Sequence, residues 1–256
     1  MVAQRTGQGV ARIAPTAQTT PQARDAAPIV SVWTRTYERP ERTARATPLD
    51  DVVARSRGYE VAKRALDILG SGVGLALLAP IFAIIALCVK IEGHGSVIHQ
   101  RQIVGRDGAP IAAYKFRTMI PNADEYLQAH PELLAEYSAN IKLRRDPRIT
   151  RVGALLRRTS LDELPQLFNV LRGQMSLVGP RMIHPSEEPR YGALATARRQ
   201  VRPGITGLWQ VSGRQDLSYA QRITLDRYYL SRRSFWFDLR ILIATAGVLL
   251  RRDGAY

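Results

Sequence analysis

The chain has 256 residues, enough for one large domain or two small ones, with 37 lysines and arginines against 22 acidic residues. The formal net charge of +15 calls for an anionic partner, such as nucleic acid, an anionic membrane surface or a phosphorylated substrate. The single cysteine, Cys88, excludes an intrachain disulfide, and the four histidines lack the spacing of a zinc site.

The first 58 residues differ in composition from the rest of the chain. They are rich in Ala, Thr, Pro, Gln and Arg and contain few large apolar residues. Such a segment cannot bury enough apolar surface to compensate for the entropy lost on ordering. We therefore predict a disordered tail over residues 1–58.

An uncharged apolar run extends from Ile68 to Val89. Its 22 residues would form a helix about 33 Å long, enough to span a bilayer. Pro80 lies near the middle, where a proline removes a helical hydrogen bond and bends the helix. Because both flanks are basic, charge favours neither orientation across a membrane. We predict a re-entrant helix-break-helix over residues 59–92, broken at Pro80, with an ordinary crossing as the alternative.

A β-hairpin is expected after this run. Residues 96–102 and 111–118 have the composition of strands, and residues 105–108 supply the turn between them. Lys115 and Arg117 alternate along the second strand, so both cations should lie on one face of it. Two cations on one face can hold a diphosphate, whereas the plainer interpretation is a solvated strand face.

An acidic pair, Asp162 and Glu163, stands in a segment otherwise crowded with cations. From residue 142 to residue 181 the chain has nine lysines and arginines and one further carboxylate, Asp146. Apolar residues at 164, 167, 168 and 171 predict a helix that starts just after the pair, with Pro165 in its first turn. Acidic residues are common there because they complement the helix dipole. They are also ionised at pH 7, so the pair could attack phosphorus or bind a metal ion.

The C-terminal segment suits a membrane interface. Residues 235–256 begin with three aromatic residues and continue as an apolar stretch, with Asp238 and Arg240 inside and arginines at both ends. Aromatic rings and arginines favour the headgroup region of a bilayer. We predict a C-terminal interfacial helix over these residues.

Five motifs, taken together and in order, resemble one family. They are Lys-Phe-Arg-Thr-Met at 115–119, Asp-Pro-Arg-Ile-Thr at 146–150, Arg-Arg-Thr-Ser-Leu-Asp-Glu-Leu-Pro-Gln at 157–166, Met-Ser-Leu-Val-Gly-Pro-Arg at 175–181 and Pro-Gly-Ile-Thr-Gly-Leu-Trp-Gln-Val-Ser-Gly-Arg at 203–214. The chain from about residue 63 onwards resembles the bacterial sugar transferases, which are monotopic phosphoglycosyl transferases. It is similar to their short type, which starts exopolysaccharide synthesis. Met182 stands where the family usually has a second proline.

The predicted elements and this resemblance together imply a membrane-associated α+β fold. The re-entrant helix would be followed by a small cytoplasmic α/β catalytic domain at residues 93–234 and by amphipathic interfacial helices, the last at 235–256. The family implies transfer of a hexose 1-phosphate, with galactose or glucose as the sugar, from a UDP-sugar to undecaprenyl phosphate. It also implies Mg2+ and a location at the cytoplasmic face of the bacterial inner (plasma) membrane.

The resemblance also assigns roles to residues of this chain. Asp162 would displace UMP and hold the phosphosugar, while Glu163 would help Asp162 to place Mg2+ or would handle the proton of the acceptor. The cations that would neutralise the phosphates are Lys115, Arg117, Arg157, Arg181 and Arg214.

Two other classes of protein fit the charge alone. A membrane-tethered nucleic-acid binder would retain DNA in a salt-dependent way and would not need Asp162. A non-catalytic scaffold would dock its basic domain on anionic lipids. The ordered motifs count against both, so we expect a UDP-sugar, undecaprenyl phosphate and the lipid bilayer as partners, and no nucleic acid. Which sugar is used and whether the chain forms homo-oligomers are left open.

Overall fold

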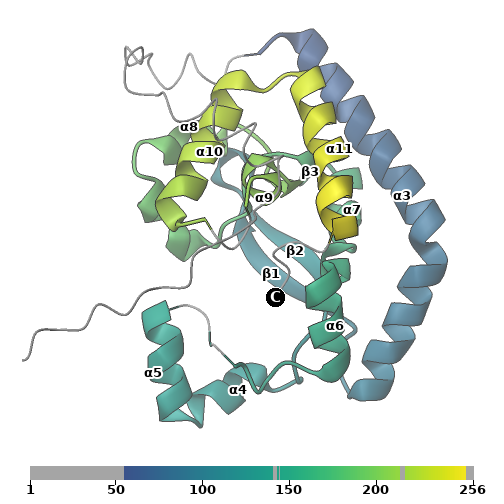
Figure 1. Cartoon of the computed structure of the whole chain (residues 1–256), viewed down its shortest axis with the longest axis vertical. Coiled ribbons are helices and arrows are strands. Elements are labelled where there is room, and N and C mark those ends of the chain that lie inside the picture. Colours follow the sequence, from purple (N-terminus) through teal and green to yellow (C-terminus); the bar gives the residue numbers. More distant parts are fainter. Residues whose placement is uncertain (1–54, 141–142, 144, 214–216, 252–256) are drawn as a thin grey trace, which may run out of the picture.

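A computed structural model of the chain describes residues 55–140, 143, 145–213 and 217–251 (Figure 1). The tail predicted over residues 1–58 therefore lies outside the described residues as far as residue 54, and so does Arg214. The described part combines helices with two small sheets, as expected for an α+β chain.

The longest element is helix α3 (Arg57–Glu92), which runs along one flank of the molecule (Figure 1). Ser56 caps its N-terminus, with the hydroxyl accepting a hydrogen bond from the backbone N–H of Tyr59. Among the described residues it is the one helix long and apolar enough to cross a membrane. Helical structure continues through Pro80, and the helix curves in Figure 1 rather than separating into two. The break predicted at Pro80 is therefore a bend within one helix.

Glycines allow α3 to approach the rest of the chain closely. A Cβ atom added to Gly70 would lie 2.6 Å from Cδ1 of Leu177, and one added to Gly74 would lie 3.3 Å from Cδ1 of Leu167. Larger side chains at these two positions would push the helix away. The Gly70–Gly74 segment therefore serves helix packing.

The predicted hairpin is confirmed, with shifts of one or two residues at its ends. Strand β1 (Ile98–Val104) pairs antiparallel with β2 (Pro110–Phe116), and the short 3-10 turn η1 (Arg106–Gly108) connects them. Asp107 and Gly108 in this turn have φ values of 57° and 76°, a left-handed region in which glycine and aspartate are among the more tolerant residues.

The remaining elements build a helical body around a second, parallel pair of strands, β3 and β4. In chain order they are α4 (Ala123–Gln128), α5 (Pro131–Asn140), α6 (Arg151–Thr159), η2 (Leu161–Glu163), α7 (Gln166–Leu171), β3 (Ser176–Val178), η3 (Pro185–Tyr191), α8 (Leu194–Arg199), β4 (Gly204–Thr206), α9 (Leu208–Val211), α10 (Tyr219–Arg232) and α11 (Phe235–Arg251). One buried cluster joins β3, α8, α9, α10 and α11, and another joins the hairpin to α7.

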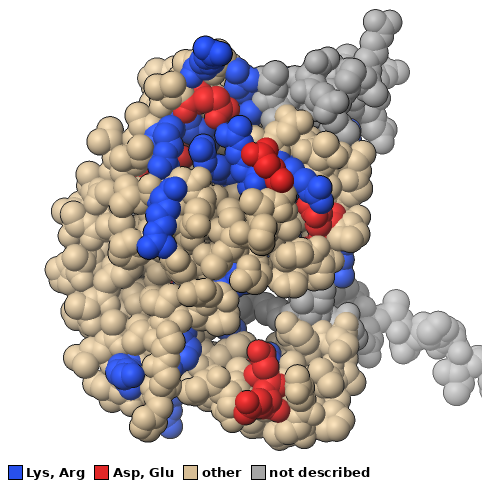
Figure 2. Space-filling view, turned by 180° about the vertical axis from the view of Figure 1, so that it is seen from behind, with Lys and Arg blue, Asp and Glu red and all other residues tan. Residues whose placement is uncertain are grey.

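The outer side of the molecule along α3 and α11 is apolar. Figure 2 shows that lysines and arginines gather at the end where α3 begins, whereas the flank along which α3 runs is almost uncharged. Large hydrophobic side chains are exposed on α3, α6, α7 and α11, among them Val73, Leu77, Ile84, Leu87, Leu155, Phe168, Leu171, Trp236 and Ile243. An apolar surface of this extent is typical of contact with lipid or protein.

Helix α7 has its polar side inside. Gln166 and Asn169 are fully buried, whereas Phe168 and Leu171 are 43% and 40% exposed. The apolar spacing that predicted this helix thus faces α3 and the outer surface, where the ring of Phe168 packs edge-on against Phe82 of α3 at 6.1 Å between centroids. This reversal continues the apolar flank onto α7.

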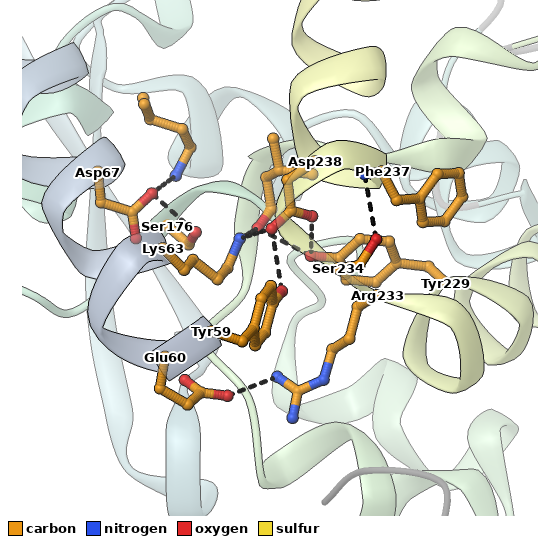
Figure 3. Close-up of polar contacts among 12 residues, drawn as sticks. Tyr59, Glu60, Lys63, Asp67, Ser176, Tyr229, Arg233, Ser234, Phe237 and Asp238 are labelled. Atoms are coloured by element: carbon orange, nitrogen blue, oxygen red, sulfur yellow. Dashed lines mark hydrogen bonds and ion pairs between the residues drawn. The ribbon is translucent and has the colours of Figure 1, made fainter. Parts of the chain in front are cut away.

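The N-terminal end of α3 is fixed to the start of α11 by a buried ion pair (Figure 3). Lys63 Nζ lies 2.7 Å from Oδ2 of Asp238 and also donates to the carbonyl of Val178. The hydroxyls of Tyr59 and Tyr229 donate to the two oxygens of the same carboxylate at 2.9 and 2.8 Å. The buried carboxylate of Asp238 is therefore both paired with a cation and hydrogen-bonded, as a buried charge requires.

The C-terminal end of α3 is fixed to the same body. Glu92 accepts hydrogen bonds from the backbone N–H of Val152, in the first turn of α6, at 2.9 and 3.1 Å. The guanidinium of Arg117 donates to the last carbonyls of α3 and of the turn that follows, those of Val89, Gly93 and His94. Both ends of α3 thus belong to one folded unit.

Candidate active site

The acidic pair lies in η2, between α6 and α7, as predicted. Ser160 ends α6 in a left-handed conformation with φ 58°. This uncommon conformation for a serine turns the chain sharply, so that η2 starts in a new direction. Asp162 points inward and is only 8% exposed, whereas Glu163 is half-buried.

Lys115 lies against both carboxylates. Its Nζ atom is 2.5 Å from Oε1 of Glu163 and 3.8 Å from Oδ2 of Asp162. The lysine comes from β2 and the pair from η2, 48 residues apart in sequence for Lys115 and Glu163. The structure therefore joins the predicted cation to the predicted carboxylates.

Burial controls the protonation of Asp162. Loss of solvent raises the pKa of its carboxyl from 3.8 to about 6, helped by the negative charge of Glu163 and opposed by Lys115 and Arg157. At pH 7 an acid with this pKa is still ionised by about ten to one. The side chain is thus a poorly solvated carboxylate, more basic than a surface aspartate, which suits a nucleophile.

Arg157 approaches the pair from α6. Its Nε atom donates to the hydroxyl of Thr118 at 2.8 Å. Burial lowers the pKa of this guanidinium, and the charge of Asp162 partly restores it. Lys115 and Arg157 are thus the two predicted phosphate ligands that the structure brings to the acidic pair.

Arg117 and Arg181 point elsewhere. The guanidinium of Arg117 donates to the carbonyls at the end of α3 and in the turn that follows. The guanidinium of Arg181 lies 4.6 Å from the centroid of the Trp209 ring, and its backbone N–H donates to Asp226. The segment that follows Arg181 is bound to the far end of the hairpin, because the N–H of Val104 donates to the carbonyl of Ile183. Val104 is about 17 Å along the hairpin from the level of Lys115. Phosphate binding by Arg117 and Arg181 stays a prediction, and Arg214 lies outside the described residues.

The protein by itself supplies only some of the ligands that a divalent cation needs. Among the described residues no group of three or more Asp, Glu, His or Cys side chains could hold a metal ion. Mg2+, however, commonly uses one or two carboxylates and takes its other ligands from substrate phosphates and water. Asp162 and Glu163, adjacent and mutually repelling, supply those two carboxylates. The residues present therefore fit Mg2+ bound together with a phosphorylated substrate.

Asn169 is a functional candidate that the sequence reading missed. Its side-chain oxygen accepts from the N–H of Tyr114 at 2.9 Å, and its amide nitrogen donates to the carbonyl of Ala112 at 2.8 Å. The residue thereby fixes α7 against β2, and so holds the acidic pair at the level of Lys115. A polar residue among the apolar positions of a short helix was the available signal.

The chain is similar to several known proteins. A family model described as "Bacterial sugar transferase" matches residues 58–252. The exopolysaccharide production protein ExoY of Rhizobium meliloti is 40% identical over 221 residues, which are 85% of this chain and 94% of ExoY. The undecaprenyl-phosphate galactose phosphotransferase of Salmonella typhimurium is 46% identical over 204 residues, 78% of this chain and 43% of that protein.

A third relative is the UDP-glucose:undecaprenyl-phosphate glucose-1-phosphate transferase of Caulobacter vibrioides. It is 40% identical over 205 residues, 77% of this chain and 73% of that protein. The chain spans about two-fifths of the length of the longer relatives, such as the Salmonella protein. The matched region contains the acidic pair, Lys115 and all of α3 except its first residue. The chain belongs to the bacterial sugar transferase family.

Proposed function

We propose that this protein transfers hexose 1-phosphate from UDP-galactose or UDP-glucose to undecaprenyl phosphate and releases UMP, as the first step of exopolysaccharide synthesis. The observation that carries the proposal is the buried Asp162, with a pKa raised to about 6, beside Glu163 and Lys115. Of the relatives described above, one is named for UDP-glucose and undecaprenyl phosphate, one for galactose and undecaprenyl phosphate, and one for exopolysaccharide production.

In the first step an Oδ atom of Asp162 attacks the phosphorus that bears the sugar. The bond from this phosphorus to the bridging oxygen breaks, and UMP leaves with that oxygen and the electron pair. Lys115 and Arg157 neutralise charge on the phosphates, where preorganised cations act strongly because little solvent reaches them. The product is a phosphosugar bound to the carboxylate of Asp162.

In the second step a phosphate oxygen of undecaprenyl phosphate attacks the same phosphorus. The bond to Asp162 breaks, which regenerates the carboxylate and leaves a diphosphate between lipid and sugar. Glu163 accepts a proton from the acceptor when the acceptor phosphate arrives protonated. Mg2+ held by Asp162 and Glu163 would neutralise phosphate charge at this site.

The same proposal places α3 within one leaflet, with the catalytic body on the cytoplasmic side. Support comes from the two ends of the helix, which both bind one folded unit, through Lys63 and Asp238 at one end and through Arg117 and Glu92 at the other. A helix that crossed the bilayer would carry its two ends to opposite sides. Entry to one leaflet keeps Asp162 at headgroup depth, where the phosphate of a polyprenyl lipid lies.

Covalent trapping tests the proposal. Membranes containing the full-length protein are incubated with UDP-galactose or UDP-glucose labelled in the sugar, without acceptor. We expect release of UMP and a labelled protein adduct in the wild type. Asp162→Asn should give no adduct and a loss of activity of at least about 1000-fold, because removal of a nucleophile leaves only binding effects.

Asp146→Asn is the matched control, since Asp146 pairs with Arg148 in the loop before α6. It should still form the adduct. Equal adduct formation by wild type and Asp162→Asn would contradict the proposed nucleophile. Comparison of the two labelled donors identifies the sugar.

A further inference from the structure

A groove at the junction of α10 and α11 lies outside the acidic-pair site. Its volume is about 320 Å3, and its walls come from the end of α10 and the first turns of α11. The lining residues are Tyr228, Arg232, Ser234, Trp236, Phe237 and Arg240.

The groove is cationic, and its wall contains no acidic residue among those that the structure describes. Arg232 and Arg240 are both exposed, and neither has an ion pair or hydrogen bond with any residue that the structure describes. The acidic residue of α11, Asp238, points away from the groove and towards Lys63 (Figure 3). Among the described residues no anion pairs with the two guanidinium groups, so both are available to bind one.

Arg240 also interrupts an apolar stripe. Trp236 and Ile243 are 68% and 66% exposed, and with Arg240 they follow one face of α11 at helical spacing. Arginine on a lipid-facing stripe is stable only where its head reaches the phosphate layer, while its stem and the neighbouring apolar side chains remain in lipid. This pattern favours an anion that carries acyl chains over a free anion.

The groove is remote from the acidic pair. Lys63 of α3 binds Asp238 beside the groove, whereas Ile85 of α3 belongs to the cluster that includes Leu161, next to Asp162. Lys63 and Ile85 are 22 positions apart, which corresponds to about 33 Å of helix. A ligand in the groove is therefore distinct from the substrates proposed above.

We propose that this groove binds the phosphate of a glycerophospholipid headgroup through Arg232 and Arg240, with Trp236 against the glycerol and first acyl carbons. The inference depends on the placement of α11 at a membrane interface within the proposed function. It assigns the groove a structural lipid, separate from the polyprenyl acceptor.

The test uses the full-length protein in detergent, titrated with short-chain phosphatidylglycerol and followed by native mass spectrometry. We expect Arg232→Gln and Arg240→Gln each to weaken binding about tenfold, because each removes a charged hydrogen bond. Arg227→Gln, an exposed arginine of α10 outside the groove, should bind like the wild type. Short-chain diacylglycerol, which lacks the phosphate, should bind weakly to all four proteins.

Unchanged binding by the two groove variants, or an equal loss in Arg227→Gln, would overturn the proposal. Inorganic phosphate that competes fully with the lipid would also overturn it, because the site would then recognise a free anion. The titration contains no sugar nucleotide, so it can be read even where transfer fails.

Discussion

Asp162 is a carboxylate whose ionisation depends on its neighbours, so the pH profile of the reaction should report on it. As the proposed nucleophile it must be deprotonated to react, and burial raises the pKa of this group to about 6. Single-turnover UMP release should therefore fall about tenfold for each pH unit below about 6. A rate that stays flat down to pH 4 would show that a group other than Asp162 limits the reaction.

Lys115 opposes the burial effect on Asp162, and its removal should shift that profile. In Lys115→Met the attraction of the ammonium is lost, so the pKa of Asp162 rises and the acidic limb moves to higher pH. Arg158→Met, an exposed arginine of α6 outside the pair, should leave the limb in place. An unshifted limb in Lys115→Met would mean that the lysine does not act on Asp162.

The same shift predicts how stability changes with pH. The pKa of Asp162 is higher in the folded protein than in the unfolded chain, so folding favours the protonated form. The contribution of Asp162 to stability should be largest below about pH 4 and should be lost as the pH rises through about 6. Compared with the wild type, Asp162→Asn should therefore gain stability in thermal unfolding in detergent as the pH rises from about 4 to above 6.

At the scale of elements, Arg117 has two candidate roles, stabilisation of α3 and phosphate binding, and a single variant can distinguish them. Its guanidinium donates to carbonyls at the C-terminal end of α3, where a cation also complements the negative end of the helix dipole. Arg117→Leu should therefore lower the free energy of unfolding by about 1.5–3 kcal/mol and leave KM for the UDP-sugar unchanged. A raised KM with unchanged stability would instead favour the phosphate contact expected from strand alternation.

The ion pair between Lys63 and Asp238 gives a larger effect. Lys63→Met leaves a buried carboxylate without its cation, which should cost about 3–5 kcal/mol in thermal unfolding. Lys90→Met, at the exposed C-terminal end of α3, removes the same charge and should cost less than about 1 kcal/mol. Similar losses in the two variants would show that the charge of the helix, and not this ion pair, matters.

Local signals explain which elements the sequence could predict. The turn at residues 105–108 is specified by a few neighbouring residues, so the strands of the hairpin could be placed within about two residues. Lys63 and Asp238 are 175 residues apart, and no local sequence pattern around either residue predicts their contact. The outward face of α7 could not be predicted either, because spacing identifies an apolar stripe but not what covers it.

At the scale of the whole molecule, the attachment of both ends of α3 to one body makes the membrane topology testable. In a Cys88→Ser background, Arg57→Cys and His94→Cys place single thiols at exposed positions near the two ends of the helix. We expect a membrane-impermeant maleimide to label both in inside-out vesicles and neither in intact spheroplasts. Labelling of the two positions from opposite sides would show an ordinary crossing.

The bond between Tyr59, Lys63 and Asp238 also dictates when the nascent chain can finish folding. Lys63 leaves the ribosome 175 residues before Asp238, and Tyr59 leaves it 179 residues before Asp238. At about 5–20 residues per second this interval lasts roughly 10–35 s. Throughout that time the apolar helix is already synthesised while its partners at residues 161–178 and 238 are incomplete. During translation this helix therefore requires early delivery to the bilayer or protection by a chaperone, well before Asp238 is synthesised and can bind Lys63.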